Sequence, residues 1–281
     1  MNIKHTMKIK ILPIVLITLL FSNCKTDKNK VEPINNETAV EQNNKPSSDI
    51  ENSNFYEASN IKITPIEHAS LVLEYNNTSI YIDPVGDAER YTPFSSPNFI
   101  LITDSHGDHL DTKTLEAINT TNTFIIGPEA VKEKLPESLK AKFNVFFNGL
   151  NESFSIGEFT MGVEAIPMYN LREEALKFHT KGRGNGYILT LNNQRIYISG
   201  DTEDIPEMRN LDNIDIAFVC MNLPYTMPVE NAADAVLAFQ PKIVLPYHYR
   251  GTEGLSDVAN FKTIINNKNK AIEVVQLNWY K

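Results

Sequence analysis

The sequence has little of several features that define whole classes of protein. Only two of its 281 residues are cysteines, which excludes a disulfide framework, and its 12 glycines and 15 prolines exclude a collagen-like or low-complexity chain. Basic residues (26) are outnumbered by acidic ones (35), so no nucleic-acid-binding surface is expected. The most apolar stretch, residues 11–21, is shorter than the roughly 20 residues that a membrane-spanning helix needs. A hydrophobic fraction of 42% and a net charge of -9 predict an acidic globular protein.

The N-terminus has the pattern of an export signal. Three lysines precede the apolar stretch 11–21, as in the basic and hydrophobic regions of a signal peptide. Residues 20–23 (LFSN) and the following Cys24 resemble the lipobox of bacterial lipoproteins. That resemblance implies a cleaved signal peptide at 1–23 and lipidation of Cys24. The protein would then be an exported lipoprotein, anchored to a bacterial membrane and facing the periplasm or the cell surface. An ordinary signal peptide and an uncleaved anchor are the alternatives.

The chain after this signal divides into two parts. Residues 24–58 are rich in Asn, Lys, Glu, Ser and Thr, and cannot bury enough apolar surface to fold, so they predict a flexible linker. Residues 59–281 have the length of one ordinary domain. Removal of 1–23 takes away three lysines and no acid, which leaves 23 basic and 35 acidic side chains and a net charge of -12.

Short apolar runs alternate with helix-like segments throughout the predicted domain. Strands are expected at 61–66, 71–75, 79–82, 98–103, 123–126, 145–147, 153–156, 160–166, 187–191, 195–199, 216–220, 243–245 and 272–276. Helices are expected at 111–118, 129–135, 137–143, 228–239 and 256–265, with Asp111 as an N-cap, Pro228 in the first turn and a loop at 167–185. Because strands and helices are interspersed, the sequence favours a layered α/β fold.

One polar segment concentrates ligand-type side chains. Residues 102–110 (ITDSHGDHL) directly follow an apolar strand and contain Asp104, His106, Asp108 and His109. A loop at a strand end can aim such side chains into one pocket. Imidazole nitrogens and carboxylate oxygens are the usual ligands of catalytic zinc and related metals, so the segment predicts a metal site.

This segment resembles the HxHxDH motif of the metallo-β-lactamase-fold superfamily. Three further matches follow the expected order: Asp83-Pro84 after an early strand, Gly200-Asp201-Thr202, and Tyr247-His248 at the end of an apolar strand. The resemblance implies an α/β (α+β) fold, a four-layer αββα sandwich with its site at one edge. Residues 67–71, 181–187 and 225–227 are most similar to a branch that holds ascorbate-6-phosphate lactonase-like and N-acylphosphatidylethanolamine phospholipase D-like hydrolases.

The same resemblance implies two divalent metal ions, zinc first, with manganese or iron as alternatives. The first would be held by His106 and the second by Asp108, His109 and His248, with Asp201 between them. Two departures stand out. Asp104 replaces the first histidine of the motif, either as a ligand that lowers the charge of the centre from about +1 to about neutral, or as a partner that orients a ligand. The usual later histidine is missing, and His179 is the candidate replacement. A substrate contact or a surface position are its alternatives, and Asn170 or Tyr169 could supply an oxygen instead.

Other residues receive predicted roles from their place beside these motifs. Asp108, His68 and Tyr225 are the candidate catalytic residues. His68 would be an orienting or substrate-contacting group, with a core histidine as its alternative. Tyr225 would support an oxyanion or pack at the rim of the site. Asp83 is expected to hold the 104–109 loop, and Cys220 to be a buried, inert thiol. The candidate substrate-binding residues are Lys181, Arg183, Tyr187 and Arg250, although the three cations could equally be solvated loop residues.

The predicted function is therefore that of a metal-dependent hydrolase. A metal-bound hydroxide would attack an ester, lactone or phosphodiester bond of a small-molecule or lipid substrate. The alternatives are a phospholipase D-like hydrolase of membrane lipids and a catalytically inactive metal-binding lipoprotein. The sequence leaves the oligomeric state open.

Overall fold

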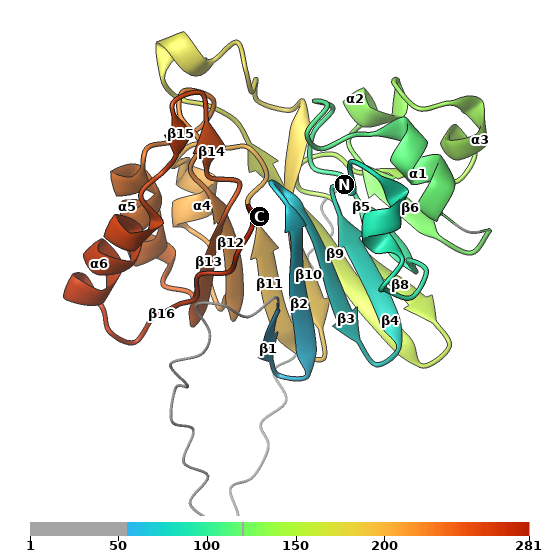
Figure 1. The fold of residues 1–281 in the computed structure, drawn as a ribbon, viewed down its shortest axis with the longest axis horizontal. Helices are drawn as coiled ribbons and strands as arrows, with labels where there is room; N and C mark the ends of the chain where they lie inside the picture. Colours follow the sequence, from blue (N-terminus) through green and yellow to red (C-terminus); the bar gives the residue numbers. More distant parts are fainter. Residues whose placement is uncertain (1–54, 120, 281) are drawn as a thin grey trace, which may run out of the picture. The chain divides into compact units, whose positions relative to one another are not determined.

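Two mixed sheets of seven strands each form the centre of the domain (Figure 1). The computed structural model describes residues 55–119 and 121–280. The strands of the first sheet follow chain order: β1 (Tyr56–Ala58), β2 (Ile61–Glu67), β3 (Ser70–Tyr75), β4 (Thr78–Ile82), β5 (Phe99–Leu101), β6 (Phe124–Gly127) and β7 (Phe143–Val145).

The second sheet has the order β16-β13-β12-β11-β10-β9-β8. Its strands are β8 (Asn151–Ile156), β9 (Phe159–Met168), β10 (Gly184–Leu191), β11 (Gln194–Ile198), β12 (Ile216–Cys220), β13 (Ile243–Tyr247) and β16 (Glu273–Val274). A small hairpin, β14 (Arg250–Gly251) and β15 (Gly254–Leu255), follows β13. In each sheet the first connections are antiparallel hairpins and the later ones parallel crossovers.

Helices cover the outer faces of both sheets. Beside the first sheet lie η2 (Ala88–Tyr91), α1 (Thr112–Ile118), α2 (Glu129–Lys132) and α3 (Glu137–Lys140), and beside the second lie α4 (Pro206–Arg209), α5 (Val229–Phe239) and α6 (Val258–Lys268) (Figure 1). A further turn, η3 (Glu173–Ala175), lies in the loop after β9. The predicted four-layer αββα sandwich is confirmed.

Apolar side chains fill the space between the sheets and the space under the helices on each side. Along β5, Phe99 and Leu101 point into the core between the sheets, whereas Ile100 packs with Leu115 and Val131 under the helices of the first sheet. A strand buried on both faces is apolar at every position because successive side chains alternate between the faces. The all-apolar run before the polar segment is thus explained: both of its faces are covered.

Several sequence-based boundaries differ from the structure. The linker does not extend to residue 58, because β1 pairs with β2 from Tyr56. The expected helices at 129–135 and 137–143 are single turns, and Phe143 belongs to β7, where its ring is buried. Asp111 caps α1 as predicted through the N–H groups of residues 113 and 114, but Pro228 occupies the N-cap of α5 instead of its first turn.

Some predictions concern residues that the structure does not describe. The signal peptide at 1–23, the lipidation of Cys24 and most of the linker lie outside the described residues. Among residues 55–119 and 121–280, no helix has the length and apolar character to cross a membrane. The other cysteine, Cys220, is fully buried and free, and burial raises the pKa of its thiol to about 12. An inert thiol is expected of such a site, as predicted.

Candidate metal centre

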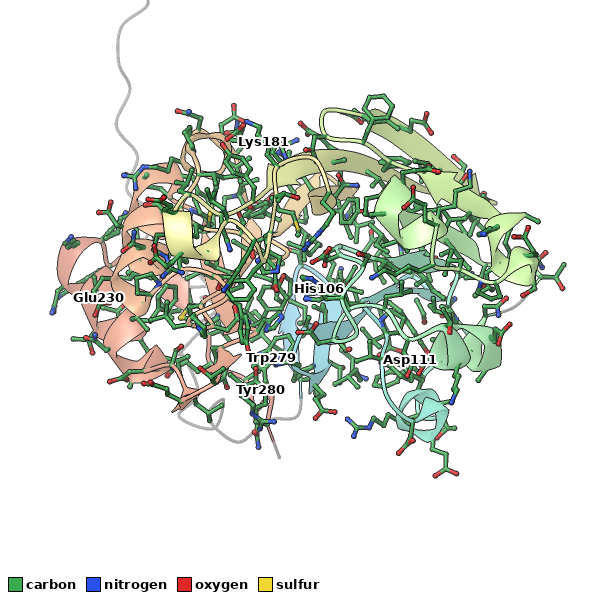
Figure 2. The ribbon with its side chains drawn as sticks, turned by 90° about the horizontal axis from the view of Figure 1, so that it is seen from above. His106, Asp111, Lys181, Glu230, Trp279 and Tyr280 are labelled. Atoms are coloured by element: carbon green, nitrogen blue, oxygen red, sulfur yellow. The ribbon has the colours of Figure 1, made fainter. Side chains whose placement is uncertain are left out.

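The polar residues that follow four strands meet at one edge of the sandwich. Asp83 follows β4, the 104–109 loop follows β5, Asp201 follows β11 and His248 follows β13. Carboxyl ends of neighbouring parallel strands share one edge of a sheet, which brings these segments together. Viewed from above, His106 lies near the middle of this edge, between the two halves of the chain (Figure 2).

The backbone at this edge is constrained to present its side chains. His68, Asp83 and His248 are held at positive φ angles of 56°, 44° and 47°, which are uncommon for residues other than glycine. Gly200, before Asp201, has a φ of 60°, and a Cβ there would lie 2.6 Å from the Met168 sulfur. The turn that presents Asp201 therefore requires glycine.

The first group of ligand-type side chains consists of Asp108, His109, Asp201 and His248. The Nε2 atoms of His109 and His248 face each other at 3.1 Å. Asp201 lies 3.1 Å from His248 Nε2 and 3.4 Å from His109 Nε2. Asp108 Oδ2 lies 3.4 Å from His248 Nε2.

The second group consists of Asp104, His106 and His179. Asp104 Oδ2 lies 2.9 Å from His106 Nδ1 and 3.6 Å from His179 Nε2. His179 Nε2 also lies 3.1 Å from Asp201 Oδ2. Asp201 thus contacts both groups, the position predicted for a residue between two ions. His179, the candidate for the missing histidine, lies within reach of Asp104 and Asp201.

Both groups fit divalent metal ions. Two ligands at about 2.0–2.2 Å from one ion lie roughly 3–3.5 Å apart, close to the separations observed here. The buried atoms His179 Nε2 and Asp201 Oδ1 make no hydrogen bond despite their close neighbours. This arrangement is expected of lone pairs that point at bound cations. The donor set, imidazole and carboxylate, is that of zinc, manganese and iron sites.

The remaining ring nitrogens are held by neighbouring groups. His109 Nδ1 lies 2.9 Å from Asp83, whose other bonds come from the N–H and hydroxyl of Thr103. His179 Nδ1 lies 3.0 Å from the carbonyl of Tyr225, and His248 Nδ1 lies 3.2 Å from the Asn222 amide. Partners of this kind fix the orientation of ligand histidines. The predicted holding role of Asp83 agrees with these contacts.

Charge interactions dominate this buried centre. Burial alone would raise the pKa of Asp201, but the imidazoles of His248, His109 and His179 together lower it well below its usual range. Burial would likewise lower the pKa of His109, yet the carboxylates of Asp201 and Asp83 raise it well above its usual value. Three imidazoles therefore stabilise the charged form of Asp201, and two carboxylates stabilise that of His109. A metal ion held here would take the place of the proton on His109, because a ligand imidazole is neutral.

The loop after β9 brings His179 and Arg183 to the centre. The Asn170 N–H donates to the His179 carbonyl at 2.9 Å, and the Asn170 amide donates to the carbonyl groups of Ala175 and Tyr225. Arg183 donates to both carboxylate oxygens of the fully buried Asp104, at 2.7 and 3.2 Å. Arg183, predicted to bind substrate, is thus first of all the partner of Asp104.

The other predicted residues lie at different distances from the centre. His68 Nε2 lies 3.4 Å from Asp108 Oδ2, so His68 belongs to the site. Tyr225 contributes its carbonyl oxygen, while its ring packs against Phe178 at 5.1 Å. Lys181 is engaged by Glu207 at 2.7 Å. Arg250 is exposed and stacks on Tyr280 with its guanidinium 4.1 Å from the ring centre.

The prediction for Tyr187 is wrong. This side chain is fully buried between the sheets, and its hydroxyl donates to the Ile102 carbonyl at 2.9 Å, so it cannot contact a substrate. Position 187 belongs to β10, and its alternation directs the side chain into the core. The sequence motif placed this tyrosine near the site along the chain but could not show which face it occupies.

Replacement of Tyr187 by phenylalanine is therefore expected to affect stability alone. The Ile102 carbonyl would lose its buried donor, which costs about 1–3 kcal/mol of unfolding free energy. Urea unfolding measures this loss, and the KM for any substrate should remain that of the parent chain. A raised KM with unchanged stability would restore the substrate-binding role.

Tyr280 is a site residue that sequence reasoning missed. Its hydroxyl lies 2.9 Å from His68 Nδ1, although the two residues are 212 positions apart. No local motif surrounds it, and only the last strand prediction indicated that the chain returns toward the sheets. Glu203 was also missed: it accepts the N–H groups of Leu171 and Arg172 and pairs with the Arg172 side chain at 2.7 Å, which holds the start of the His179 loop.

The chain is similar to known proteins over most of the described domain. Residues 62–248 match the family model of a β-lactamase superfamily domain. A UPF0173 metal-dependent hydrolase from Archaeoglobus fulgidus is 25% identical over 228 residues, 77% of this chain and 96% of that protein. Another from Lysinibacillus sphaericus is 28% identical over 190 residues, 65% of this chain and 82% of that protein.

Solved structures of metal-dependent hydrolases are also similar to this chain. A protein of Parabacteroides distasonis, assigned as a metal-dependent hydrolase, has a TM-score of 0.69 at 41% identity, over 80% of this chain and 98% of that one. A metallo hydrolase from Ignicoccus hospitalis has a TM-score of 0.62 at 21% identity, over 76% of this chain and 93% of that one, and so shares the fold. Since the family model covers more than half of the chain and the Parabacteroides protein exceeds 30% identity, the chain belongs to the metallo-β-lactamase-fold superfamily of metal-dependent hydrolases.

Proposed function

We propose that this hydrolase cleaves an ester, lactone or phosphodiester bond with two divalent ions, zinc first, held by the two groups of side chains. The observation that carries the proposal is the position of Asp201, which is buried and contacts His248, His109 and His179. One carboxylate that joins two sets of ligands is suited to a dinuclear centre. Manganese and iron remain alternatives because Asp104 adds a carboxylate.

When bound, divalent ions supply Lewis acidity to the substrate oxygen and lower the pKa of water. The side chains of the centre accept protons and position the reacting groups. Asp108 is the most exposed carboxylate of the centre, with 42% of its side chain accessible, so this carboxylate can accept a proton from an attacking water. His68 Nε2, 3.4 Å from Asp108 Oδ2, holds this carboxylate in place.

The charge of the centre supports an anionic substrate. Asp104 in place of a histidine makes the expected centre about neutral, but Arg183 adds one positive charge directly to that carboxylate. With Arg183 included, the expected net charge of the centre is again about +1. Within the described residues, Arg250 contacts no carboxylate, which leaves its guanidinium able to bind an anionic group by two parallel hydrogen bonds.

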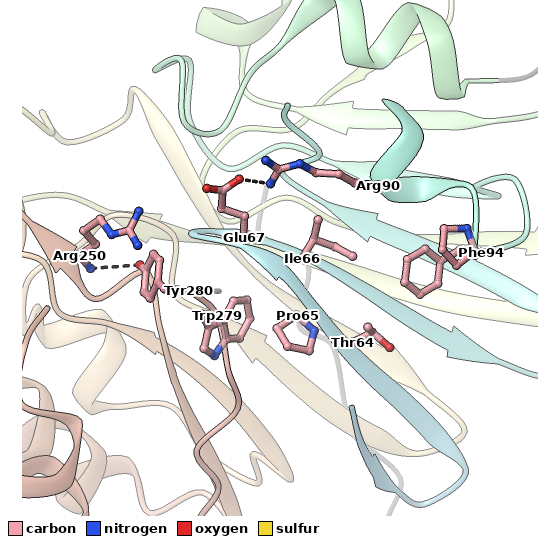
Figure 3. A pocket seen from close by; sticks show the side chains of 10 residues that line it. Thr64, Pro65, Ile66, Glu67, Arg90, Phe94, Arg250, Trp279 and Tyr280 are labelled. Carbon is pink, nitrogen blue, oxygen red and sulfur yellow. Dashed lines mark hydrogen bonds and ion pairs between the residues drawn. The ribbon is translucent and has the colours of Figure 1, made fainter. Parts of the chain in front are cut away.

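The phospholipase D-like alternative has one observation in its favour. A pocket of about 390 Å³ beside the centre has an apolar wall of Pro65, Ile66, Phe94, Trp279 and Tyr280, and Arg250 and the Glu67–Arg90 ion pair also line it (Figure 3). An apolar wall with a cation at its edge is suited to an acyl chain attached to an anionic group. We keep membrane lipids as the second candidate substrate for this reason.

The location of the enzyme is part of the proposal. The basic residues, apolar stretch and Cys24 of the N-terminus support export and a lipid anchor, which would place the enzyme at a bacterial membrane. Radiolabelled palmitate should then be incorporated into the parent chain and not into a Cys24→Ser variant. Equal labelling of both chains would contradict the anchor.

Metal removal and a substrate panel test the hydrolase proposal. The purified chain should lose activity on dialysis against a chelator and regain it with stoichiometric zinc, manganese or iron. The panel contains a phosphodiester, a phosphorylated lactone, a simple ester and an N-acylphospholipid in vesicles. Turnover of the lipid alone would favour the second candidate. A chain that binds metal but hydrolyses none of them would support the inactive metal-binding lipoprotein.

A further inference from the structure

Tyr280 connects the pocket wall with the candidate metal centre. Its ring lies in the wall of the pocket, and its hydroxyl faces the Arg250 backbone (Figure 3). The hydroxyl oxygen lies 3.1 Å from the N–H groups of both Tyr249 and Arg250 and 2.9 Å from His68 Nδ1. One phenol hydroxyl group therefore makes three polar contacts.

The number of protons decides how these contacts are made. A phenol has one proton to donate and two lone pairs to accept with. The N–H groups of Tyr249 and Arg250 can only donate, so they fill both lone pairs. The remaining contact, to His68 Nδ1, must then use the proton of Tyr280. Nδ1 of His68 is the acceptor, and a neutral imidazole with an unprotonated Nδ1 carries its hydrogen on Nε2.

We propose that Tyr280 fixes His68 as the Nε2–H tautomer, so that His68 donates to Asp108 and does not bind a metal ion. Tyr280 is thus a positioning residue that acts on the reaction through His68. The tautomer follows from the contacts alone. Its effect on turnover rests on the proposed function, in which Asp108 accepts a proton.

The surroundings of His68 keep its ring in this arrangement. The ring packs against His248 with 3.9 Å between the ring centres, and the His68 carbonyl accepts the His248 N–H at 3.2 Å. The Nε2 atom therefore stays 3.4 Å from Asp108 Oδ2. Although His68 is this close, it is absent from both groups of ligand-type side chains. A protonated Nε2 agrees with this position, since a nitrogen that carries a proton has no lone pair for an ion.

Nitrogen-15 NMR of the histidine rings tests the proposal in the metal-free chain at neutral pH. The signals of His68 are those lost in a His68→Gln variant. In the parent chain, Nδ1 of His68 should have the shift of an unprotonated nitrogen and Nε2 that of an N–H. Tyr280→Phe removes the donor, so the spectrum should change to a mixture of both tautomers. Tyr249→Phe is the matched control, because this neighbouring tyrosine packs on Tyr280 without contacting His68, and it should leave the tautomer unchanged.

The kcat and KM of the Tyr280→Phe variant give a second test of the proposal. Loss of a partner that orients a site residue typically costs 10–100-fold, so Tyr280→Phe should lower kcat by about this factor and leave KM nearly unchanged. An Nδ1–H tautomer, a doubly protonated ring, or a spectrum that Tyr280→Phe does not change would overturn the proposal, even if kcat falls. Because the NMR measurement needs no substrate, it decides the tautomer whether or not the hydrolase proposal succeeds.

Discussion

Replacement of Asp201 by asparagine is expected to lower the content of both metal ions together. Asp201 is the side chain that contacts both groups, with His179 in one and His109 and His248 in the other. The amide is neutral and offers one oxygen in place of two. Activity should fall by at least about 100-fold, the upper end of what the loss of a supporting partner causes, because Asp201 contacts the ligands directly.

Matched variants separate the two groups. His179→Ala should remove only the ion of the Asp104 group, and His248→Ala only the ion of the Asp108 group. Elemental analysis of the dialysed proteins gives the number of ions per chain. Retention of both ions in Asp201→Asn, or loss of the same single ion that either histidine variant loses, would contradict the joining role of Asp201.

Replacement of Arg183 by glutamine is expected to destabilise the metal-free protein strongly. Asp104 is fully buried, and Arg183 contacts both of its oxygens. Removing one partner of a buried ion pair costs about 3–5 kcal/mol, because the remaining charge is left without compensation. We expect a cost near the lower end of this range, because the Ser105 N–H and His106 Nδ1 still face the Asp104 carboxylate. For a domain of this size, about 3 kcal/mol corresponds to a Tm lower by roughly 6–12 °C.

Metal should reverse much of this loss, because a cation held by Asp104, His106 and His179 replaces the missing positive charge. Calorimetric scans with and without zinc measure both effects. Lys181→Gln is the control: Lys181 pairs with Glu207 at the surface, where solvent screens the two charges, so the loss of this pair should leave the Tm nearly unchanged. If Arg183→Gln and Lys181→Gln melt at the same temperature, the pair with Asp104 does not stabilise the fold.

The Asp104–Arg183 pair also changes how the aspartate at position 104, where the family motif has a histidine, affects the charge of the centre. From the sequence, Asp104 only removes positive charge from the centre. In the structure, Arg183, which lies four residues after His179, restores this positive charge. The substitution and its compensation lie 79 positions apart, so the local pattern around Asp104 could not reveal them as one unit.

The sequence by itself determined the fold family and most of the candidate ligands. Asp104, His106, Asp108 and His109 lie within one short loop, and a strand end defines the direction of such a loop. Asp201 and His248 were predictable for the same reason, since each follows a largely buried strand of the second sheet. Local patterns of alternation and strand ends carry this information, because they depend on neighbours in the chain.

Only the tertiary structure decided the contacts between distant segments. Tyr187 is a core residue because of the face of β10 that it occupies. His179 reaches the centre because its loop folds back on itself, as the bond from the Asn170 N–H to the His179 carbonyl shows. Tyr280 contacts His68 because the fold brings together segments that are 212 positions apart. These contacts depend on packing and on the number of protons available to each polar group, which a single sequence does not record.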